Sequence, residues 1–432
     1  MRTSYLLSLF GLLMLVSACR SGREVSQSQI PDFPVENYAV TEYLYNSVST
    51  FSDVQDSVYR SSFFDKARAF RPDQPRTKTI TFASSRARRA VVTMATDARF
   101  CEKVLEDTIT LTDGQGSYTL RNFVPGRTYY YKVEAGGRKI LKGALRATGR
   151  VRMIALDRGF NIRDLGGWTG YDGRTVRYEQ IYRGASIGGT DMDGQTSDIT
   201  DADRAELSRI GIRAHLDLRA PTDKGLYAGE HSLHSYALGR TTLSGADYNN
   251  TMTDRGAYGE DASVVSDIAW IIYELRRGRP VYFNCRQGAD RTGTIAFVVE
   301  ALLGCYGEDE GHQMAMDYEL TGFSGANLVD NVKVASSYRG ATEAYGNRRK
   351  LFRKLLSLEV EGITFHNLQE RVYYYLNQAC AEHGATIDSC DLDWFICHML
   401  DIDHFPHSTW AGRGDELKRV AEMNAQVVTY CP

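Results

Sequence analysis

The sequence predicts an α/β domain of open-sheet type, preceded by a small all-β sandwich. In residues 77–148, apolar side chains recur at every second position between turn signals such as Asp113-Gly114, which is the pattern of short strands. From about residue 150 onward, short apolar runs alternate with helical patterns, as in a sheet covered by helices. The length of 432 residues exceeds one ordinary domain, so two domains are expected.

Local signals place the elements of the α/β domain. Amphipathic or wholly apolar patterns predict helices over residues 201–211, 263–275, 292–303 and 368–380. Two apolar runs, 212–218 and 280–283, predict buried strands, and the second runs directly into Asn284-Cys285. The chain then divides into a signal segment (1–19), a tether with an unassigned stretch (20–75), the sandwich (76–149) and the α/β domain (150–432).

Within the sandwich, residues 123–133 resemble the fibronectin type III pattern around its tyrosine corner. That resemblance implies that a tyrosine hydroxyl closes back on nearby backbone, and Tyr129 stands at the matching position. A sandwich of this kind carries no chemistry by itself, so its expected role is that of a spacer or a lid.

The first residues form a targeting segment. Arg2 precedes a short apolar run, and small residues lead to Cys19, which resembles a bacterial lipoprotein signal with lipid on the Cys19 sulfur. The alternative is an ordinary secretory signal peptide. Both interpretations place the mature protein outside the cytoplasm, and the lipid anchor would hold it in the bacterial cell envelope. The non-acidic residues 20–22 resemble sorting to the outer membrane.

Composition limits the expected partners. The net charge of −3 gives no general attraction to nucleic acid or to anionic membranes, so membrane contact is expected through the lipid anchor only. The C-terminal quarter holds Cys380, Cys390, Cys397 and Cys431, and their disulfide pairing cannot be read from spacing. A metal site with the nearby histidines is the rival interpretation, but the spacing fits no zinc pattern, so no metal is expected.

Residues 281–294 combine a strand, a tight loop and a helix, which is the arrangement that phosphoryl chemistry needs. Backbone N–H groups of a loop at a helix N-terminus bind phosphate oxygens and favour a thiolate, so Cys285 is the candidate nucleophile. Gly288 lets the loop fold closely, and Arg291 can grip two phosphate oxygens with its planar fork. Thr292 can hydrogen-bond the thiolate. The alternative is a buried structural cysteine that precedes a helix.

These residues resemble the cysteine phosphatase signature, Cys-x5-Arg-Ser/Thr. The ending Asp290-Arg291-Thr292-Gly293 is similar to that of the atypical bacterial tyrosine-protein phosphatase family, which also acts on phosphoinositides. Further blocks match that family in the right order: Asn161-Ile162-Arg163-Asp164-Leu165-Gly166-Gly167, Ile181-Tyr182-Arg183-Gly184, Leu216-Asp217-Leu218-Arg219 and Asp317-Tyr318-Glu319-Leu320. The resemblance implies a cysteine-phosphatase fold, with a central mixed sheet flanked by helices, and makes residues 150–432 the catalytic domain.

The resemblance also implies site roles. Hydrolysis of a phosphate monoester would proceed through a cysteinyl-phosphate on Cys285, with Arg291 as the phosphate clamp and no cofactor. The remaining phosphate contacts would come from Arg286, Gln287, Gly288, Ala289 and Thr292. The substrate would be a phosphorylated protein, a phosphoinositide or an inositol polyphosphate. A catalytically silent lipoprotein that binds phosphorylated ligands is the rival from another class.

The sequence leaves open the identity of the general acid and the roles of Arg163 and Asp164. Asp290 is the implied general acid, whereas orthodox tyrosine phosphatases use an Asp on a mobile loop, for which Asp247 or Asp254 in the polar segment 244–261 would serve. The favoured alternative for Asp247 and Asp254 is a solvated loop charge. Arg163 and Asp164 either face the pocket or form a salt-bridged scaffold under the phosphate loop.

Two departures from the family pattern concern the loop itself. Asn284 precedes the nucleophile where most relatives have histidine, and Ala289 replaces a lysine of close relatives.

Overall fold

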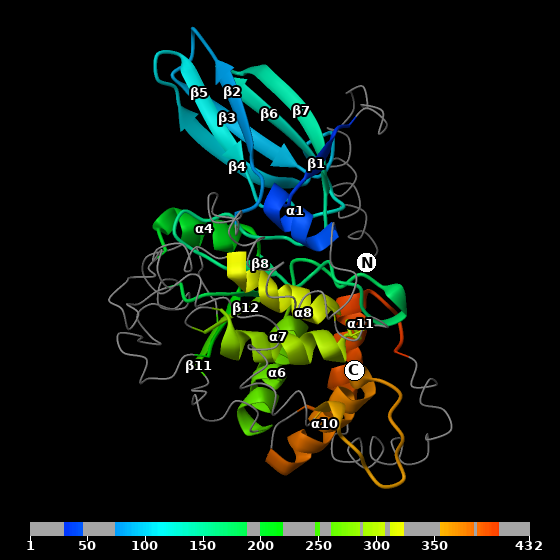
Figure 1. The fold of residues 1–432 in the computed structure, drawn as a ribbon. Helices are drawn as coiled ribbons and strands as arrows, with labels where there is room; N and C mark the ends of the chain where they lie inside the picture. The colour runs from blue at the N-terminus through cyan, green and yellow to red at the C-terminus, as the bar shows by residue number, and fades with distance from the viewer. Residues whose placement is uncertain are drawn as a thin grey trace, which may run out of the picture. The chain divides into compact units, whose positions relative to one another are not determined.

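The computed structural model divides the chain into two units (Figure 1). The structure describes residues 30–45, 74–187, 199–218, 247–250, 261–285, 288–306, 312–323, 355–383 and 387–405. The first unit comprises the described residues up to Val35 together with residues 77–149, and the second comprises the other described residues. The described residues of the segment 20–75, which the sequence left unassigned, are therefore divided between the two units.

The first unit is a sandwich of two sheets around one apolar core. One sheet has the order β1-β7-β6-β3-β4 and the other pairs β2 with β5. The strands are β1 (Asp32–Pro34), β2 (Lys78–Ala83), β3 (Arg89–Ala95), β4 (Lys103–Thr110), β5 (Gln115–Leu120), β6 (Thr128–Ala135) and β7 (Arg138–Thr148). Phe82 and Leu120 of the smaller sheet pack into the same core as Val92 and Val133 of the larger sheet. The predicted small all-β sandwich is confirmed.

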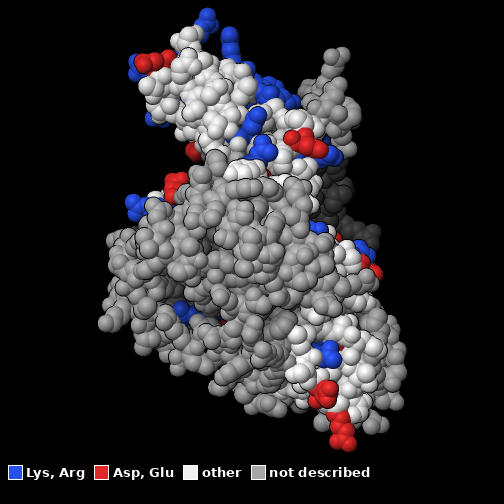
Figure 2. Space-filling view, viewed as in Figure 1, with Lys and Arg blue, Asp and Glu red and all other residues white. Residues whose placement is uncertain are grey.

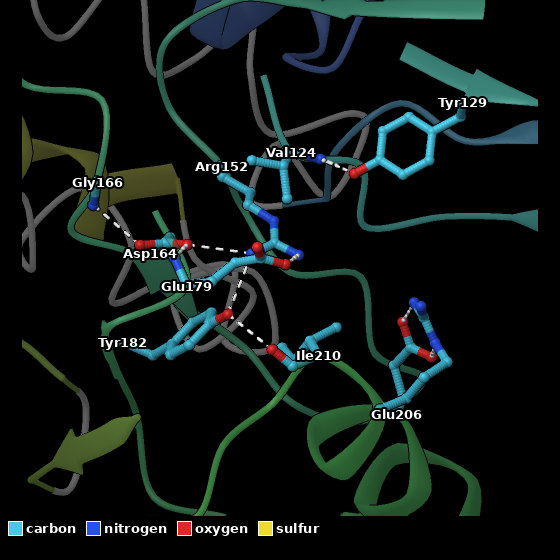
Figure 3. Close-up of polar contacts among 10 residues, drawn as sticks. Val124, Tyr129, Arg152, Asp164, Gly166, Glu179, Tyr182, Glu206 and Ile210 are labelled. Atoms are coloured by element: carbon cyan, nitrogen blue, oxygen red, sulfur yellow. Dashed lines mark hydrogen bonds and ion pairs between the residues drawn. The ribbon is translucent and has the colours of Figure 1, made fainter. Parts of the chain in front are cut away.

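Short-range signals set the turns of this sandwich. Asp113 and Gly114 both have positive φ, as do Gly136 and Gly137 between β6 and β7, and this backbone suits a tight reversal between twisted strands. Buried Tyr129 closes back on the chain as its sequence context predicts, because its hydroxyl accepts a hydrogen bond of 2.9 Å from the Val124 N–H (Figure 3).

The sandwich is strongly basic. Residues 77–149 contain 13 Lys and Arg against 6 Asp and Glu, although the whole chain has a net charge of −3. Figure 2 shows many of these basic side chains on the visible face of the unit. The net charge of the whole chain therefore conceals a difference between its parts: residues 77–149 carry a positive net charge, and the rest of the chain carries a negative one.

The second unit is built on a mixed sheet of order β11-β10-β12-β9-β8. Its strands are β8 (Arg163–Asp164), β9 (Ile181–Gly184), β10 (Ala214–Asp217), β11 (Asp247–Asn250) and β12 (Val281–Asn284). The four strands β11, β10, β12 and β9 are parallel, and β8 is antiparallel to β9. Gly184, Asn284 and Asp217 are in register at the carboxyl ends of their strands. The segments that leave these strands consequently start from one edge, where open α/β sheets bind ligands.

Helices and short turns complete the described part of this unit. They are α1 (Tyr38–Tyr45), α4 (Asp201–Arg209), α6 (Asp261–Arg276), α7 (Asp290–Leu302), α8 (His312–Glu319), α10 (Leu368–His383) and α11 (Ser389–Leu400), with 3₁₀ turns η3 (Tyr171–Gly173) and η5 (Leu320–Phe323). The helix α4 begins with a capping box, in which Thr200 Oγ1 accepts from the Asp203 N–H and the Asp203 carboxylate accepts from the Thr200 N–H.

Alternate side chains of each strand bury against different helices. Ile181, Val281 and Phe283 lie in the core that includes α6, α7, α10 and α11. Tyr182 and Tyr282 point to the other face and pack with Leu207 of α4 and its neighbours. The sheet is therefore covered on both faces, which confirms the predicted α/β architecture. No helix in the described ranges has the length and apolar character needed to cross a membrane.

The expectation of a mobile loop is wrong for residues 247–250. Residues 247–250 form strand β11 instead of a loop, and they pair in parallel with β10. Asp247 is in register with Ala214, at the amino end of the sheet. Three residues of strand, roughly 10 Å, separate that position from the carboxyl edge where Cys285 lies. The long-range pairing with β10 overrides the polar, turn-like composition of this segment.

Candidate active site

Cys285 leaves the sheet at the end of its central strand. It follows β12 directly, is only 3% exposed, and its N–H donates a hydrogen bond of 2.7 Å to Thr292 Oγ1 in the first turn of α7. Because this bond uses an oxygen lone pair of Thr292, the hydroxyl hydrogen remains for another acceptor. The nucleophile candidate is thus fixed between a strand end and a helix start.

The loop between β12 and α7 leads directly into the amino end of α7. The helix begins at Asp290, and its N-cap residue, Ala289, makes no side-chain capping bond. The first N–H groups of a helix have no partner within the helix, and the helix dipole is positive at this end. A phosphate group bound in the loop would accept hydrogen bonds from these N–H groups, and its negative charge would interact favourably with the helix dipole.

Gly288 allows the loop to approach the sheet closely. Its φ is +68°, and an added Cβ would lie 2.4 Å from the carbonyl carbon of Gly184 and 2.7 Å from the Ala185 nitrogen. Both atoms belong to backbone, which cannot move aside cheaply. Glycine is therefore required at this position by backbone conformation and by contact with the end of β9.

A buried arginine of β9 holds the same loop from behind. The Arg183 Nη2 donates a hydrogen bond of 2.9 Å to the carbonyl oxygen of Gly288, and its side chain is 1% exposed. Since a trans peptide points its N–H opposite to its C=O, this bond also sets the direction of the following N–H, that of Ala289. Arg183 thereby contributes to setting the direction of the Ala289 N–H.

Arg183 belongs to a buried ion network that includes two carboxyl groups. Asp317 pairs with Arg183 and accepts a hydrogen bond of 2.8 Å from Arg163 Nε. Arg163 also donates to Asn161 Oδ1 at 2.5 Å. Burial, and then the neighbouring Asp317 carboxylate, raise the pKa of Glu300 well above its ordinary range, which favours the protonated form of Glu300. Beneath the loop, the Asp317 carboxylate thus pairs with two buried guanidinium groups.

Arg291 is anchored from the neighbouring strand. Its Nη1 donates a hydrogen bond of 3.0 Å to the carbonyl oxygen of Leu218, just beyond the end of β10, and the residue is only 5% exposed. A guanidinium held at one nitrogen keeps its planar fork in a fixed orientation. The geometry suits a preset clamp for a phosphate group.

Asp164 lies in a second buried cluster (Figure 3). Its carboxylate accepts from Arg152 Nη1 at 3.1 Å and from the N–H groups of Gly166 and Glu179 at 2.9 and 2.8 Å. Burial raises the pKa of this carboxyl, although the Arg152 guanidinium acts in the opposite direction. Tyr182 completes the cluster, because its hydroxyl accepts from Arg152 and donates to the Ile210 carbonyl. Asp164 therefore supports the backbone of its own motif.

Asn284 is tied to both the nucleophile and the adjacent strand. Its Nδ2 donates to the carbonyl oxygen of Cys285 at 3.0 Å, and its Oδ1 lies 2.5 Å from His215 Nε2 of β10. Asn284 and His215 are fully buried.

The comparison with known families identifies this arrangement. A family model described as the tyrosine phosphatase family matches residues 154–390, which is more than half of the chain. The chain belongs to the tyrosine phosphatase family. The match contains Cys285, Arg291 and all four of the motif blocks that the sequence shows.

Individual relatives are distant. A protein of Cupriavidus necator that is assigned by name to the tyrosine-protein phosphatases is 23% identical over 249 residues, which cover 50% of this chain and 88% of the relative. Two crystal structures of P. aeruginosa TpbA, one of them a variant in complex with pTyr, are similar at 18% identity and a TM-score of 0.24. Each covers 40% of this chain and 89% of the solved chain.

The structure of this tyrosine phosphatase places the predicted site residues as follows. Cys285, Gly288, Ala289, Arg291 and Thr292 come together at the carboxyl edge of the sheet. Arg163 and Asp164 occupy buried networks, which is the scaffold alternative. Lying outside the described residues are Cys19, Asp254, Arg286 and Gln287, together with the side chains of Asp247 and Asp290. In the described ranges no group of three or more His, Cys, Asp or Glu side chains is arranged to hold a metal ion.

Sequence reasoning missed three residues that support the phosphatase loop. Arg183 and Asp317 stand within motif blocks that the sequence shows, but nothing local indicates that they meet under the loop. His215 lies in a short apolar run and carries no sequence signal, because its contact with Asn284 depends on strand register.

Proposed function

We propose that this chain hydrolyses phosphate monoesters through a cysteinyl-phosphate intermediate. The Cys285 sulfur would bond to phosphorus while the bond from phosphorus to the ester oxygen breaks, and Asp290 would give its proton to that oxygen. Water then attacks the phosphorus, Asp290 takes its proton, and the sulfur–phosphorus bond breaks. Inorganic phosphate leaves and the thiolate is regenerated.

One observation carries this proposal. Cys285 lies buried between the end of β12 and the start of α7, in the same motif as an arginine that is held in place by the Leu218 carbonyl. Stabilisation of charge on the equatorial phosphate oxygens would come from Arg291 and from loop N–H groups, with further contacts from Arg286 and Gln287. Family membership supports the same chemistry.

The covalent step has a direct test. Cys285→Ser should abolish turnover while phosphate still binds, because a serine hydroxyl is far from ionised at neutral pH. Thr292→Ser serves as the matched control, since it retains the hydroxyl that accepts from the Cys285 N–H. Substantial residual turnover by Cys285→Ser would exclude the cysteinyl-phosphate.

Asp290 as the general acid has a separate signature. Asp290→Asn should slow a substrate with a poor leaving group by ~10²–10⁴-fold and an activated aryl phosphate much less, because a good leaving group needs little protonation. Asp254→Asn is the comparison variant. If only Asp254→Asn shows this dependence on the leaving group, the acid lies on a separate loop.

Phosphotyrosine is the substrate class that the family description favours. A phosphoinositide or an inositol polyphosphate would use the same loop, and both remain alternatives. A phosphate-release panel over a phosphotyrosine peptide, a phosphoserine peptide, a phosphoinositide and inositol hexakisphosphate separates these classes, with Cys285→Ser as the blank. Preference for the phosphotyrosine peptide supports the proposal, and release only from inositol phosphates overturns the substrate class. A chain that binds phosphate but releases none would be a silent binding protein.

The cellular setting is also a proposal. Lipid on Cys19 would hold the enzyme at the bacterial envelope, outside the cytoplasm, and the basic sandwich would be a spacer of fibronectin type III kind. The closure of Tyr129 on Val124 supports the second part. A Cys19→Ala form that still fractionates with membranes would argue against the lipid anchor.

A further inference from the structure

We infer that His215 is a positioning residue for the nucleophile, acting through Asn284 on the main chain of Cys285. The inference rests on the proposed function, because it assumes that Cys285 is the reacting group. Its basis is a two-step hydrogen-bond chain, from His215 Nε2 to Asn284 Oδ1 at 2.5 Å and from Asn284 Nδ2 to the Cys285 carbonyl at 3.0 Å.

The direction of this chain follows from donor and acceptor chemistry. The Cys285 carbonyl can only accept, so the amide nitrogen of Asn284 must be the atom that faces it. The amide oxygen then faces His215, and because this oxygen can only accept, Nε2 of His215 must carry a hydrogen. The Cys285 carbonyl therefore sets the orientation of the Asn284 amide, and a hydrogen on His215 Nε2 stabilises that same orientation from the other end.

The surroundings keep the imidazole in place. His215 is fully buried on β10 and is in register with Tyr282 of β12, whose ring centroid lies 5.6 Å from that of the imidazole. The Tyr282 hydroxyl is itself bound to the carbonyl oxygen of Ala185. Asn284 is two residues along β12 from Tyr282, on the same face of the sheet, which brings its amide within reach of His215.

The nucleophile is consequently held on both sides of its main chain. The Cys285 N–H is bound to Thr292 Oγ1, and its carbonyl is bound to Asn284 Nδ2. Fixing both groups fixes the direction in which the Cα–Cβ bond projects the sulfur. A displacement of about 1 Å at a reacting atom can cost ~10²-fold in rate, and a thiolate is stabilised only where the loop donors point at it.

Variants of His215 separate positioning from simple packing. His215→Phe keeps a ring of similar size and removes the donor, whereas His215→Gln retains an N–H that can reach Asn284. Tyr282→Phe is the matched control, because it loses a buried hydrogen bond on the same face of the sheet but lies outside the chain to Cys285. The free energy of unfolding of each variant, from urea denaturation, reports packing.

The decisive readout is the pH dependence of Cys285 alkylation by iodoacetamide, measured on the Cys285 peptide by mass spectrometry. His215→Phe should shift the midpoint upward by about one unit, with a matching ~10-fold loss of alkylation rate and of kcat/KM at a pH below both midpoints. His215→Gln should stay within about 3-fold of the wild type, and Tyr282→Phe should keep the wild-type midpoint while losing stability.

Two outcomes would overturn the inference. One is a His215→Phe profile that superimposes on the wild type, and the other is an equal shift in Tyr282→Phe. Should His215→Phe fail to fold, Asn284→Ser carries the same test, because serine is too short to bridge His215 and Cys285. Alkylation needs no turnover, so a wild-type enzyme that releases no phosphate would refute the proposed function and leave this measurement readable.

Discussion

Replacing Asp317 by asparagine should both destabilise the catalytic unit and slow turnover. Asp317 is the carboxylate that balances Arg163 and Arg183, and all three side chains are at most 1% exposed. Asparagine has nearly the same shape but no charge, so the substitution leaves two buried guanidinium groups without their counter-ion. Arg183 also holds the Gly288 carbonyl, which couples the network to the phosphate loop.

The expected magnitude comes from what remains after the substitution. Removing one partner of a buried ion pair typically costs about 3–5 kcal/mol. Here Arg163 keeps its bonds to the Asp317 main-chain oxygen and to Asn161, each at 2.5 Å. Burial and the charge of Asp317 both raise the pKa of Glu300, so loss of that charge favours ionisation of Glu300, which would replace some of the lost negative charge. The loss in the free energy of unfolding should therefore be about 3 kcal/mol, at the lower end of that range.

Urea denaturation and steady-state kinetics on one preparation test this reasoning. Asp317→Asn should lose at least ~10-fold in kcat/KM, because the donors of the loop are no longer aimed. Asp203→Asn is the control, since Asp203 is also a buried carboxylate but accepts only from N–H groups of Asp157, Arg158 and Thr200. It should cost about 1–2 kcal/mol without changing kcat/KM. A loss below about 1 kcal/mol for Asp317→Asn, together with unchanged kinetics, would refute the proposed support of the loop.

Three further predictions concern the loop and the network. Gly288→Ala should lower kcat/KM by ~10²-fold, because its Cβ would meet the Gly184 backbone at 2.4 Å; steady-state activity within 2-fold of the wild type would contradict this. Arg291→Lys should be nearly as damaging to kcat/KM as Arg291→Ala, since an ammonium cannot reproduce a two-pronged clamp, and a lysine variant close to wild type would disprove the geometry. Glu300→Gln should gain stability over the wild type as the pH rises above 4.5, the ordinary pKa of this carboxyl. In that range the folded protein keeps a proton that the unfolded chain has released, so wild-type stability falls by up to about 1.4 kcal/mol per pH unit until the raised pKa of Glu300 is passed. A difference in the free energy of unfolding between the two proteins that does not change with pH would contradict the raised pKa of Glu300.

Local chemistry made several features predictable from sequence alone. Cys285 and Arg291 are six positions apart, with a glycine between them and a threonine after them. This spacing identifies the loop, because a phosphate site at the start of a helix needs all of these residues in one short segment. The reversal at Asp113-Gly114 is similarly local, since few residues tolerate positive φ. In each case the interaction that decides the structure joins residues a few positions apart.

Tertiary structure alone decided what surrounds that loop. Arg183 meets the Gly288 carbonyl across 105 positions, Arg163 meets Asp317 across 154, and His215 meets Asn284 across 69. The first two contacts exist because the fold brings strands β8 and β9 together with helix α8 and the loop after β12, and the third depends on the register of the parallel strands β10 and β12. For the same reason the sequence could state two roles for Arg163, pocket or scaffold, while only its complete burial beside Asp317 assigns it to the scaffold.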